Sequence, residues 1–116
     1  MMNAEQEYEA GAAAFRAGNA AAGATHLRNA AFAGHAEAQN QLARVYFAQV
    51  KSRTDLADLE AAAQSGDHVA LFVLAMCFLD GKLIAKDTDK ALLALQHAAA
   101  RGNVMAEAML NSPAQA

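Results

Sequence analysis

The sequence predicts an all-α fold, and three observations carry this prediction. Apolar residues make up 55% of the 116 residues and charged residues only 18%, so the chain has ample material for a core. Alanine dominates the composition and the one proline is Pro113, which suits long helices packed through small side chains. A short pattern also recurs at the period of helical-hairpin repeats. We therefore expect one helical domain over residues 1–116 and no sheet.

The recurring pattern is two alanines, two variable residues, a glycine, and an alanine four positions after the glycine. It occurs in residues 30–38, 62–70 and 98–106. Its glycines, Gly34, Gly66 and Gly102, lie 32 and 36 residues apart. A leucine follows each glycine by eight residues, and in the first two copies an aromatic residue follows by twelve. This agreement predicts three helical hairpins and a short final helix.

Each position of the pattern has a mechanical role at a turn between helices. The glycine can adopt the left-handed conformation that ends a helix. Asp67 and Asn103, directly after their glycines, are good N-caps for the next helix, whereas His35 is a weaker one. The alanine, leucine and aromatic residue then fall on one helix face. We expect burial at helix crossings for Ala38, Ala70 and Ala106.

The helices follow from these turns in chain order. We expect them over residues 4–17, 20–33, 36–49, 54–65, 68–80, 88–101 and 104–111. The first pair meets at Gly18–Asn19, the second around Lys51–Thr54, and the third across Gly81–Asp87. Each pair is joined to the next helix by a repeat glycine. Asp87 is expected to cap the sixth helix and to complement its dipole.

Charge and cysteine content exclude several classes of protein. The net charge is −3, and the chain lacks a basic run or a basic stripe with aromatic residues, so we expect no nucleic-acid partner. The lone Cys77 cannot form an internal disulfide and favours a reducing compartment, the cytoplasm. The longest apolar run, residues 69–79, is far shorter than the ~20 residues of a membrane-spanning helix, and residues 1–20 lack a signal-peptide pattern. We expect no membrane partner.

The last third of the chain resembles a known repeat. After Gly66 the sequence continues with Asp-x-x-Ala, then Leu74-Ala75, Phe78-Leu79, the loop Gly81–Asp87, Lys90-Ala91 and Ala98-Ala99-x-x-Gly102. This order resembles a full repeat of the Sel-1-like branch of the tetratricopeptide superfamily. The family's loop usually runs glycine, variable, glycine, valine, two variable residues and aspartate; here Leu83 replaces the second glycine and Ile84 the valine. Residues 36–65 resemble a second repeat with a shorter loop, and residues 5–34 a general tetratricopeptide hairpin.

The resemblance implies a right-handed alpha-alpha superhelix of about three antiparallel hairpins, whose first helices line a concave groove. It implies a non-catalytic adaptor or scaffold that binds a peptide or helix of a partner protein in that groove. An alternative is an immunity or chaperone protein that neutralises one dedicated partner, such as a secreted toxin, as some small bacterial members do. Weak self-association is a third possibility, because terminal repeats need polar outer faces and the final helix is short and apolar.

Two sets of residues are the predicted partner-binding positions. They are Val69, Phe72, Met76 and Leu79 on the fifth helix and Glu37, Asn40, Arg44 and Phe47 on the third. The first set forms an apolar stripe suited to a partner helix or peptide, and we expect Phe72 and Met76 to face the groove. The alternative is that helix 68–80 is central, so that its stripe is core. The second set either adds polar specificity or forms an ordinary solvated face. Tyr8 and Phe15 either extend the groove or close the first hairpin.

No catalytic, cofactor or metal site is expected. The four histidines, His26, His35, His68 and His97, stand on different elements without the spacing of metal ligands. Cys77 has apolar neighbours, which indicates packing and low reactivity. Serine-nucleophile motifs and phosphate-binding glycine loops are missing. We therefore expect that the chain is not an enzyme.

Overall fold

The computed structural model describes residues 1–111, and that part of the chain holds seven α-helices and no strand. The helices are α1 (Ala4–Arg16), α2 (Ala20–Phe32), α3 (Ala36–Gln49), α4 (Arg53–Gln64), α5 (His68–Asp80), α6 (Thr88–Ala100) and α7 (Val104–Leu110). Every helix begins and ends within one residue of its predicted position, so the all-α class is confirmed. Within residues 1–111, none of these helices has the length and apolar character needed to cross a membrane.

The three repeat glycines make the same turn. Gly34, Gly66 and Gly102 have φ angles of 100°, 106° and 99°, in the left-handed region that the sequence predicts for them. In each copy the glycine N–H donates to the carbonyl of the second alanine, and the next residue's N–H donates to that of the first, at 3.0–3.2 Å. These bonds satisfy carbonyls that a helix end otherwise leaves without partners. The repeat seen in the sequence is therefore also a repeat of local structure.

The residue after each glycine caps the next helix. Asp67 accepts from the N–H groups of Val69 and Ala70 through one carboxylate oxygen. His35 and Asn103 each accept one such bond, from the N–H groups three residues further on. Full burial of the three pattern alanines, each 0% exposed, is confirmed for Ala38, Ala70 and Ala106. Their single methyl groups let neighbouring helices approach closely.

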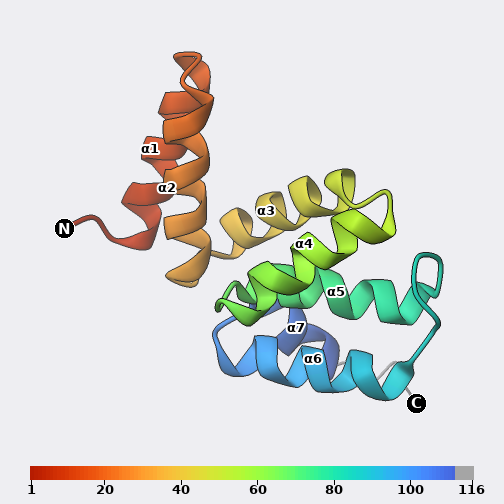
Figure 1. The fold of residues 1–116 in the computed structure, drawn as a ribbon. Helices are drawn as coiled ribbons and strands as arrows, with labels where there is room; N and C mark the ends of the chain where they lie inside the picture. The colour runs from red at the N-terminus through yellow and green to blue at the C-terminus, as the bar shows by residue number, and fades with distance from the viewer. Residues whose placement is uncertain (112–116) are drawn as a thin grey trace.

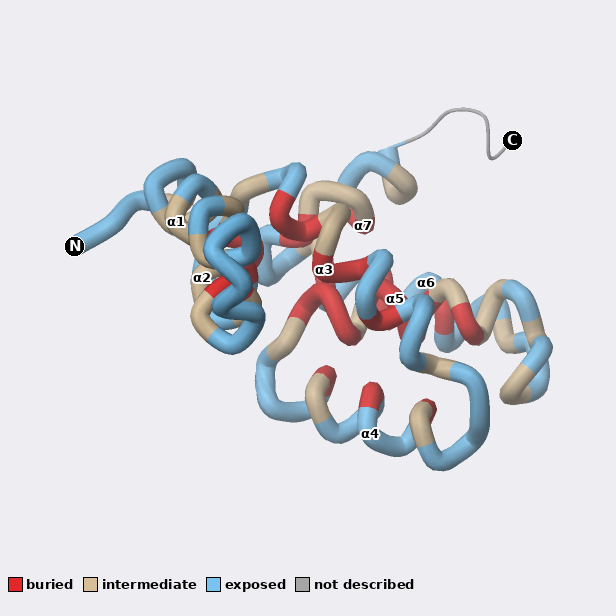
Figure 2. The backbone as a smooth tube through the Cα atoms, turned by 90° about the horizontal axis from the view of Figure 1, so that it is seen from above, coloured by how far each residue is buried: buried red, intermediate tan, exposed pale blue. Residues whose placement is uncertain are grey.

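α5 is the central helix of the fold. It packs against α3, α4 and α6. Eight of its thirteen residues are buried, so it is covered on several sides. Figure 2 shows the buried segments gathered on α3 and α5 at the centre, while the outer sides of α1, α2 and α6 are exposed.

The first hairpin, α1 with α2, is closed by two glycines; it projects from the rest of the fold in Figure 1 and joins it where α2 packs against α3. A Cβ atom at Gly11 would lie 3.3 Å from the Gly23 carbonyl oxygen, and a Cβ at Gly23 would lie 2.8 Å from the Phe15 ring. Only glycine, which has no side-chain carbon, lets the two backbones and this ring come so close at these positions. Outside this contact, His26 Nδ1 lies 2.6 Å from Glu7 Oε2 and ties the same two helices.

The second hairpin is open. α3 and α4 diverge from the short turn that joins them, and α4 makes its main contact with α5 (Figure 1). By contrast, α1 packs along α2 and α6 packs along α5. A hollow lined by residues of both helices lies beside their shared turn, and we call it the wedge.

A buried glutamine joins the start of α7 to the middle of the fold. Gln39 is 0% exposed. Its Nε2 donates to the carbonyl oxygens of Ala31 at 3.0 Å and Gly102 at 2.9 Å, and its Oε1 accepts from the Val104 N–H at 2.8 Å. A buried amide needs such partners, and these three connect the ends of α2 and α6 to α3 and α7.

Candidate functional site

Val69 and Phe72 belong to the core. Val69 is 0% exposed and Phe72 is 8% exposed, and both pack within the main hydrophobic cluster. The expectation that Phe72 faces an open groove is wrong, because α3, α4 and α6 surround α5. For these two residues the alternative interpretation, a buried stripe on a central helix, describes the structure.

The rest of the apolar stripe is only partly accessible. Met76 is half-buried and packs against the core cluster, and Leu79 is half-buried near the C-terminal end of α5. The stripe therefore opens toward solvent only at its C-terminal end. That short segment leaves little room for a partner helix along this face of α5.

The predicted face of α3 is accessible. Glu37, Arg44 and Phe47 are exposed, Phe47 to 45%, and Asn40 is half-buried. An exposed phenylalanine beside an arginine is a common composition for the anchor of an interface. These positions lie on the side of α3 that points away from the buried face carrying Leu42.

Of the two aromatic residues of α1, Phe15 packs within the first hairpin, whereas Tyr8 reaches α3. The ring of Tyr8 stacks on His35 with centroids 4.3 Å apart, and its hydroxyl accepts from Gln41 Nε2 at 2.8 Å. His35 Nε2 in turn donates to Glu5 at 2.8 Å. Phe15 covers Gly23 but keeps 46% of its surface exposed. Tyr8 thus links α1 to the start of α3.

A hollow of about 550 Å³ lies in the wedge between α3 and α4. Its apolar lining is Tyr46, Ala48, Val50, Leu59 and Ala62, and its rim includes Lys51, Asp55 and Asp58. Its volume lies in the usual range of binding pockets, and an apolar floor with a few polar groups at the edge is their usual composition. Sequence reasoning missed this hollow, because nothing in the repeat pattern indicates that the second hairpin is open.

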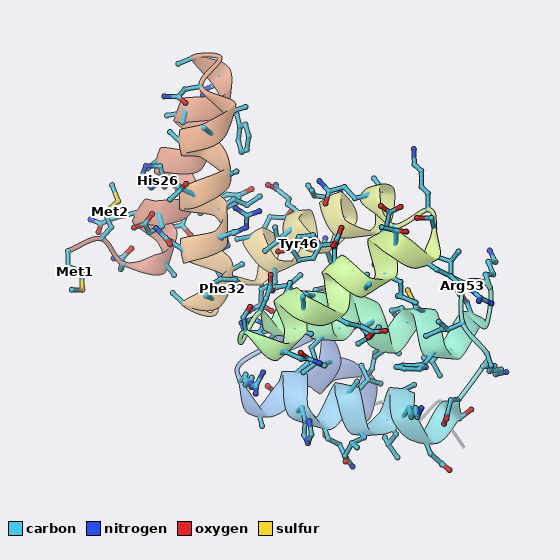
Figure 3. The ribbon with its side chains drawn as sticks, viewed as in Figure 1. Met1, Met2, His26, Phe32, Tyr46 and Arg53 are labelled. Carbon is cyan, nitrogen blue, oxygen red and sulfur yellow. The ribbon has the colours of Figure 1, made fainter. Side chains whose placement is uncertain are left out.

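Tyr46 fixes the inner wall of the wedge, and Figure 3 places it between α3 and α4. Its hydroxyl donates to the Asp67 carboxylate, which also caps α5. Burial, followed by this hydrogen bond and the nearby negative charge, raises the pKa of Tyr46 to about 12, although Arg28 acts in the opposite direction. The phenol therefore stays neutral and acts as a fixed apolar wall.

The rim of the wedge carries stable negative charge. The Asp55 carboxylate accepts from the Lys51 N–H at 2.9 Å and from the Ser52 hydroxyl at 3.0 Å. These bonds, led by the one from Lys51, lower the pKa of Asp55. Asp58, one turn further along α4, is exposed. Two carboxylates against one lysine leave the rim acidic.

His68 is a buried structural histidine. It is 3% exposed, its ring lies edge-on to Phe32 with centroids 5.6 Å apart, and its Nδ1 lies 3.3 Å from Asn103 Nδ2. Burial lowers the pKa of His68 despite the opposing effect of Asp67. The ring is therefore held neutral between α2, α5 and the start of α7.

The remaining chemically active side chains are dispersed. Cys77 is 7% exposed, and burial raises the pKa of its thiol, so the sulfur stays protonated and unreactive. Among residues 1–111, no three histidine, cysteine or acidic side chains gather as a group that could hold a metal ion.

Comparisons of the chain with protein-family models, with curated proteins and with solved structures find no significant match. The function is therefore inferred from the residues and their geometry.

Proposed function

We propose that the chain is a non-catalytic protein-binding module that holds a helix or an extended peptide of a partner in the wedge between α3 and α4. The single observation that carries this proposal is the open second hairpin. Two consecutive helices, joined by a short turn, leave an apolar hollow of about 550 Å³ between them where the other two hairpins are packed shut.

The wedge has the shape that a third helix or a peptide fills. Helices in contact lie about 8–10 Å apart. An amphipathic helix placed between α3 and α4 can therefore pack against both of them, where they do not pack against each other. Burial of apolar surface contributes about 25 cal/mol per Å², and the half-buried Val50 and Ala62 supply such surface on both sides. The acidic rim at Asp55 and Asp58 favours a partner with basic residues beside its apolar anchors.

The exposed side of α3 extends the proposed interface. Phe47 and Arg44 lie on the same helix as the wedge residue Ala48, one position and one turn away. A partner that enters the wedge near the C-terminal end of α3 passes close to them. This retains the predicted role of these α3 residues while moving the main anchor from α5 to the second hairpin.

We further infer that the hairpins are units of a Sel-1-like alpha-alpha superhelix. The support is the glycine turn and the hydrogen-bond pair that recur at residues 34–35, 66–67 and 102–103, each followed by an N-capping side chain. In such solenoids each unit buries its apolar face against the next unit. A hairpin whose two helices diverge leaves part of that apolar face open to a partner. The single buried thiol of Cys77 fits a cytoplasmic location.

Quantitative capture of the partner by matched variants tests the proposal. Ala48 is exposed and lines the wedge, so Ala48→Arg places a long side chain beside Asp55 and Asp58 and fills the space without removing a core contact. Ala57→Arg makes the same change at an exposed position of α4 outside the wedge. We expect the first variant to lose at least about tenfold in affinity for the partner captured by the unmodified chain, and the second to retain it. Equal capture by both variants would contradict the proposal.

A further inference from the structure

A second groove, of about 430 Å³, lies between α4 and α6 above α5. Figure 1 shows α4 and α6 on either side of α5, and both pack on it. This groove shares none of its lining residues with the wedge between α3 and α4. It is therefore a separate surface of the molecule.

The floor of this groove is apolar. Leu71, Leu74 and Phe78 line it at spacing i, i+3 and i+7, which places them along one face of α5. Leu71 and Phe78 are only half-buried. The floor therefore presents accessible apolar surface from two residues.

One wall of the groove is basic. Lys90, His97 and Arg101 line it from α6 and its C-cap at spacing i, i+7 and i+11, so they fall almost on one line over about 16 Å. The Lys90 ammonium lies 5.8 Å from the centroid of the Phe78 ring, which joins this wall to the floor. Within residues 1–111, neither Lys90 nor Arg101 forms a salt bridge, so their charges are available to a ligand.

The opposite wall carries a single charge. It consists of Glu60, Ala63 and Gln64 of α4. Two permanent cations therefore face one carboxylate, in a chain whose net charge is −3. The groove is a basic region on an otherwise acidic molecule.

We propose that the α4–α6 groove binds an acidic amphipathic helix of another protein. The apolar face of such a helix covers Leu71 and Phe78, and its carboxylates pair with Lys90 and Arg101. Because Lys90 and Arg101 are eleven positions apart, about 16 Å along the axis of α6, the bound segment spans about three helical turns. Complementary charge of this kind selects partners and speeds their association.

Two designed peptides test this proposal directly on the full chain. The first is a capped peptide of about 18 residues with leucines on one face and glutamates beside them, long enough to be partly helical in water. The second carries lysine at every glutamate position. Because the acidic rim of the wedge favours basic partners, the two peptides are compared on chains that carry Ala48→Arg, which fills the wedge. On these chains we expect the acidic peptide to bind at least about tenfold more tightly than the basic one, measured by fluorescence anisotropy, and its affinity to fall as salt is raised.

Charge reversal in the groove tests whether the acidic peptide binds there. In the double variant Lys90→Glu and Arg101→Glu, we expect the acidic peptide to lose at least about tenfold in affinity and the preference between peptides to reverse. The control double variant, Arg53→Glu and Lys82→Glu, makes the same charge change at exposed positions outside the groove and should keep the preference. If circular dichroism shows that the reversed variant unfolds, Lys90→Gln with Arg101→Gln takes its place and should reduce the preference.

The outcomes distinguish binding in the α4–α6 groove from binding in the wedge. Binding of the acidic peptide should survive Ala48→Arg, since that residue lines only the wedge. The proposal is overturned if neither peptide binds, if both bind equally, if the preference persists after charge reversal, or if Ala48→Arg abolishes binding. The first three results leave capture of a partner in the wedge untouched, whereas loss of binding on Ala48→Arg would place the acidic peptide in the wedge.

Discussion

The side chain of Gln39 and the backbone of Val104 are joined across 65 positions of the sequence: the Val104 N–H donates to Gln39 Oε1 at 2.8 Å. The same amide donates to the carbonyls of Ala31 and Gly102. One buried side chain therefore holds the end of α2 and the turn before α7 against α3. This contact is one of those that attach the seven-residue helix α7, which also packs on α6 and α3.

Replacing this amide should destabilise the fold. Gln39→Ala removes the side-chain partner of the Gly102 carbonyl and of the Val104 N–H, while the Ala31 carbonyl keeps its bond from the Gly34 N–H. A backbone group left without a partner costs about 1–3 kcal/mol where water cannot replace that partner. We expect a loss of at least about 2 kcal/mol in the free energy of unfolding, measured by urea denaturation. The matched change Gln49→Ala, at an exposed position of α3, should stay within about 0.5 kcal/mol of the unmodified chain. Equal midpoints for the two variants would show that the amide contributes nothing.

The pattern alanines should resist enlargement. Ala70 is 0% exposed where α5 begins, so Ala70→Leu overpacks the crossing and should cost about 1–3 kcal/mol. Ala57→Leu, on the exposed side of α4, is the control and should be close to neutral. A thermal transition of Ala70→Leu identical to that of the unmodified chain would refute the placement of this alanine at a tight helix contact.

The three repeat glycines should respond alike to substitution. At Gly34, Gly66 and Gly102 a Cβ meets no atom within 4 Å, so the cost of alanine comes from the left-handed backbone alone. We expect each glycine-to-alanine variant to lose about 1–2 kcal/mol of stability, with the three values similar. A large spread among the three denaturation midpoints would mean that the turns are not equivalent.

The stability of the chain should depend on pH through His68. Burial lowers its pKa from the ordinary value of 6.5, so the unfolded chain binds the proton more readily than the folded chain. The contribution of neutral His68 to the free energy of unfolding is thus fully present above the pKa of His68 in the unfolded chain. It is lost as pH falls through that value toward the lower pKa in the folded chain. His68→Gln removes this titration, so the loss of stability between about pH 7.5 and about pH 5.5 should be smaller in the variant. Parallel curves for the two proteins would exclude His68 as the source.

The glycine turns explain why the helix positions could be predicted from the sequence. Each helix end depends on a local signal, such as Gly66 followed by Asp67, which acts within a few residues. The burial of Ala70 followed from the same register. These features need no knowledge of how distant helices meet.

The site could not be predicted in the same way. Phe72 has the spacing of a groove residue, but its burial depends on α3, α4 and α6 surrounding α5. The wedge lined by Tyr46 and Leu59 exists because α4 packs on α5 and diverges from α3. This arrangement depends on tertiary packing, which the local sequence pattern does not indicate. The role of Gln39 likewise depends on partners more than sixty positions away.

Site-specific photo-crosslinking from the wedge tests the central claim most directly. A photo-reactive amino acid in place of Ala48 lies at the wall of the α3–α4 wedge, whereas one in place of Ala57 lies on the exposed side of α4. With the captured partner bound, irradiation should attach the partner to the chain at position 48 and not at position 57, as read by mass spectrometry of the adduct. A bound partner that crosslinks from position 57 but never from position 48 would contradict binding in the wedge.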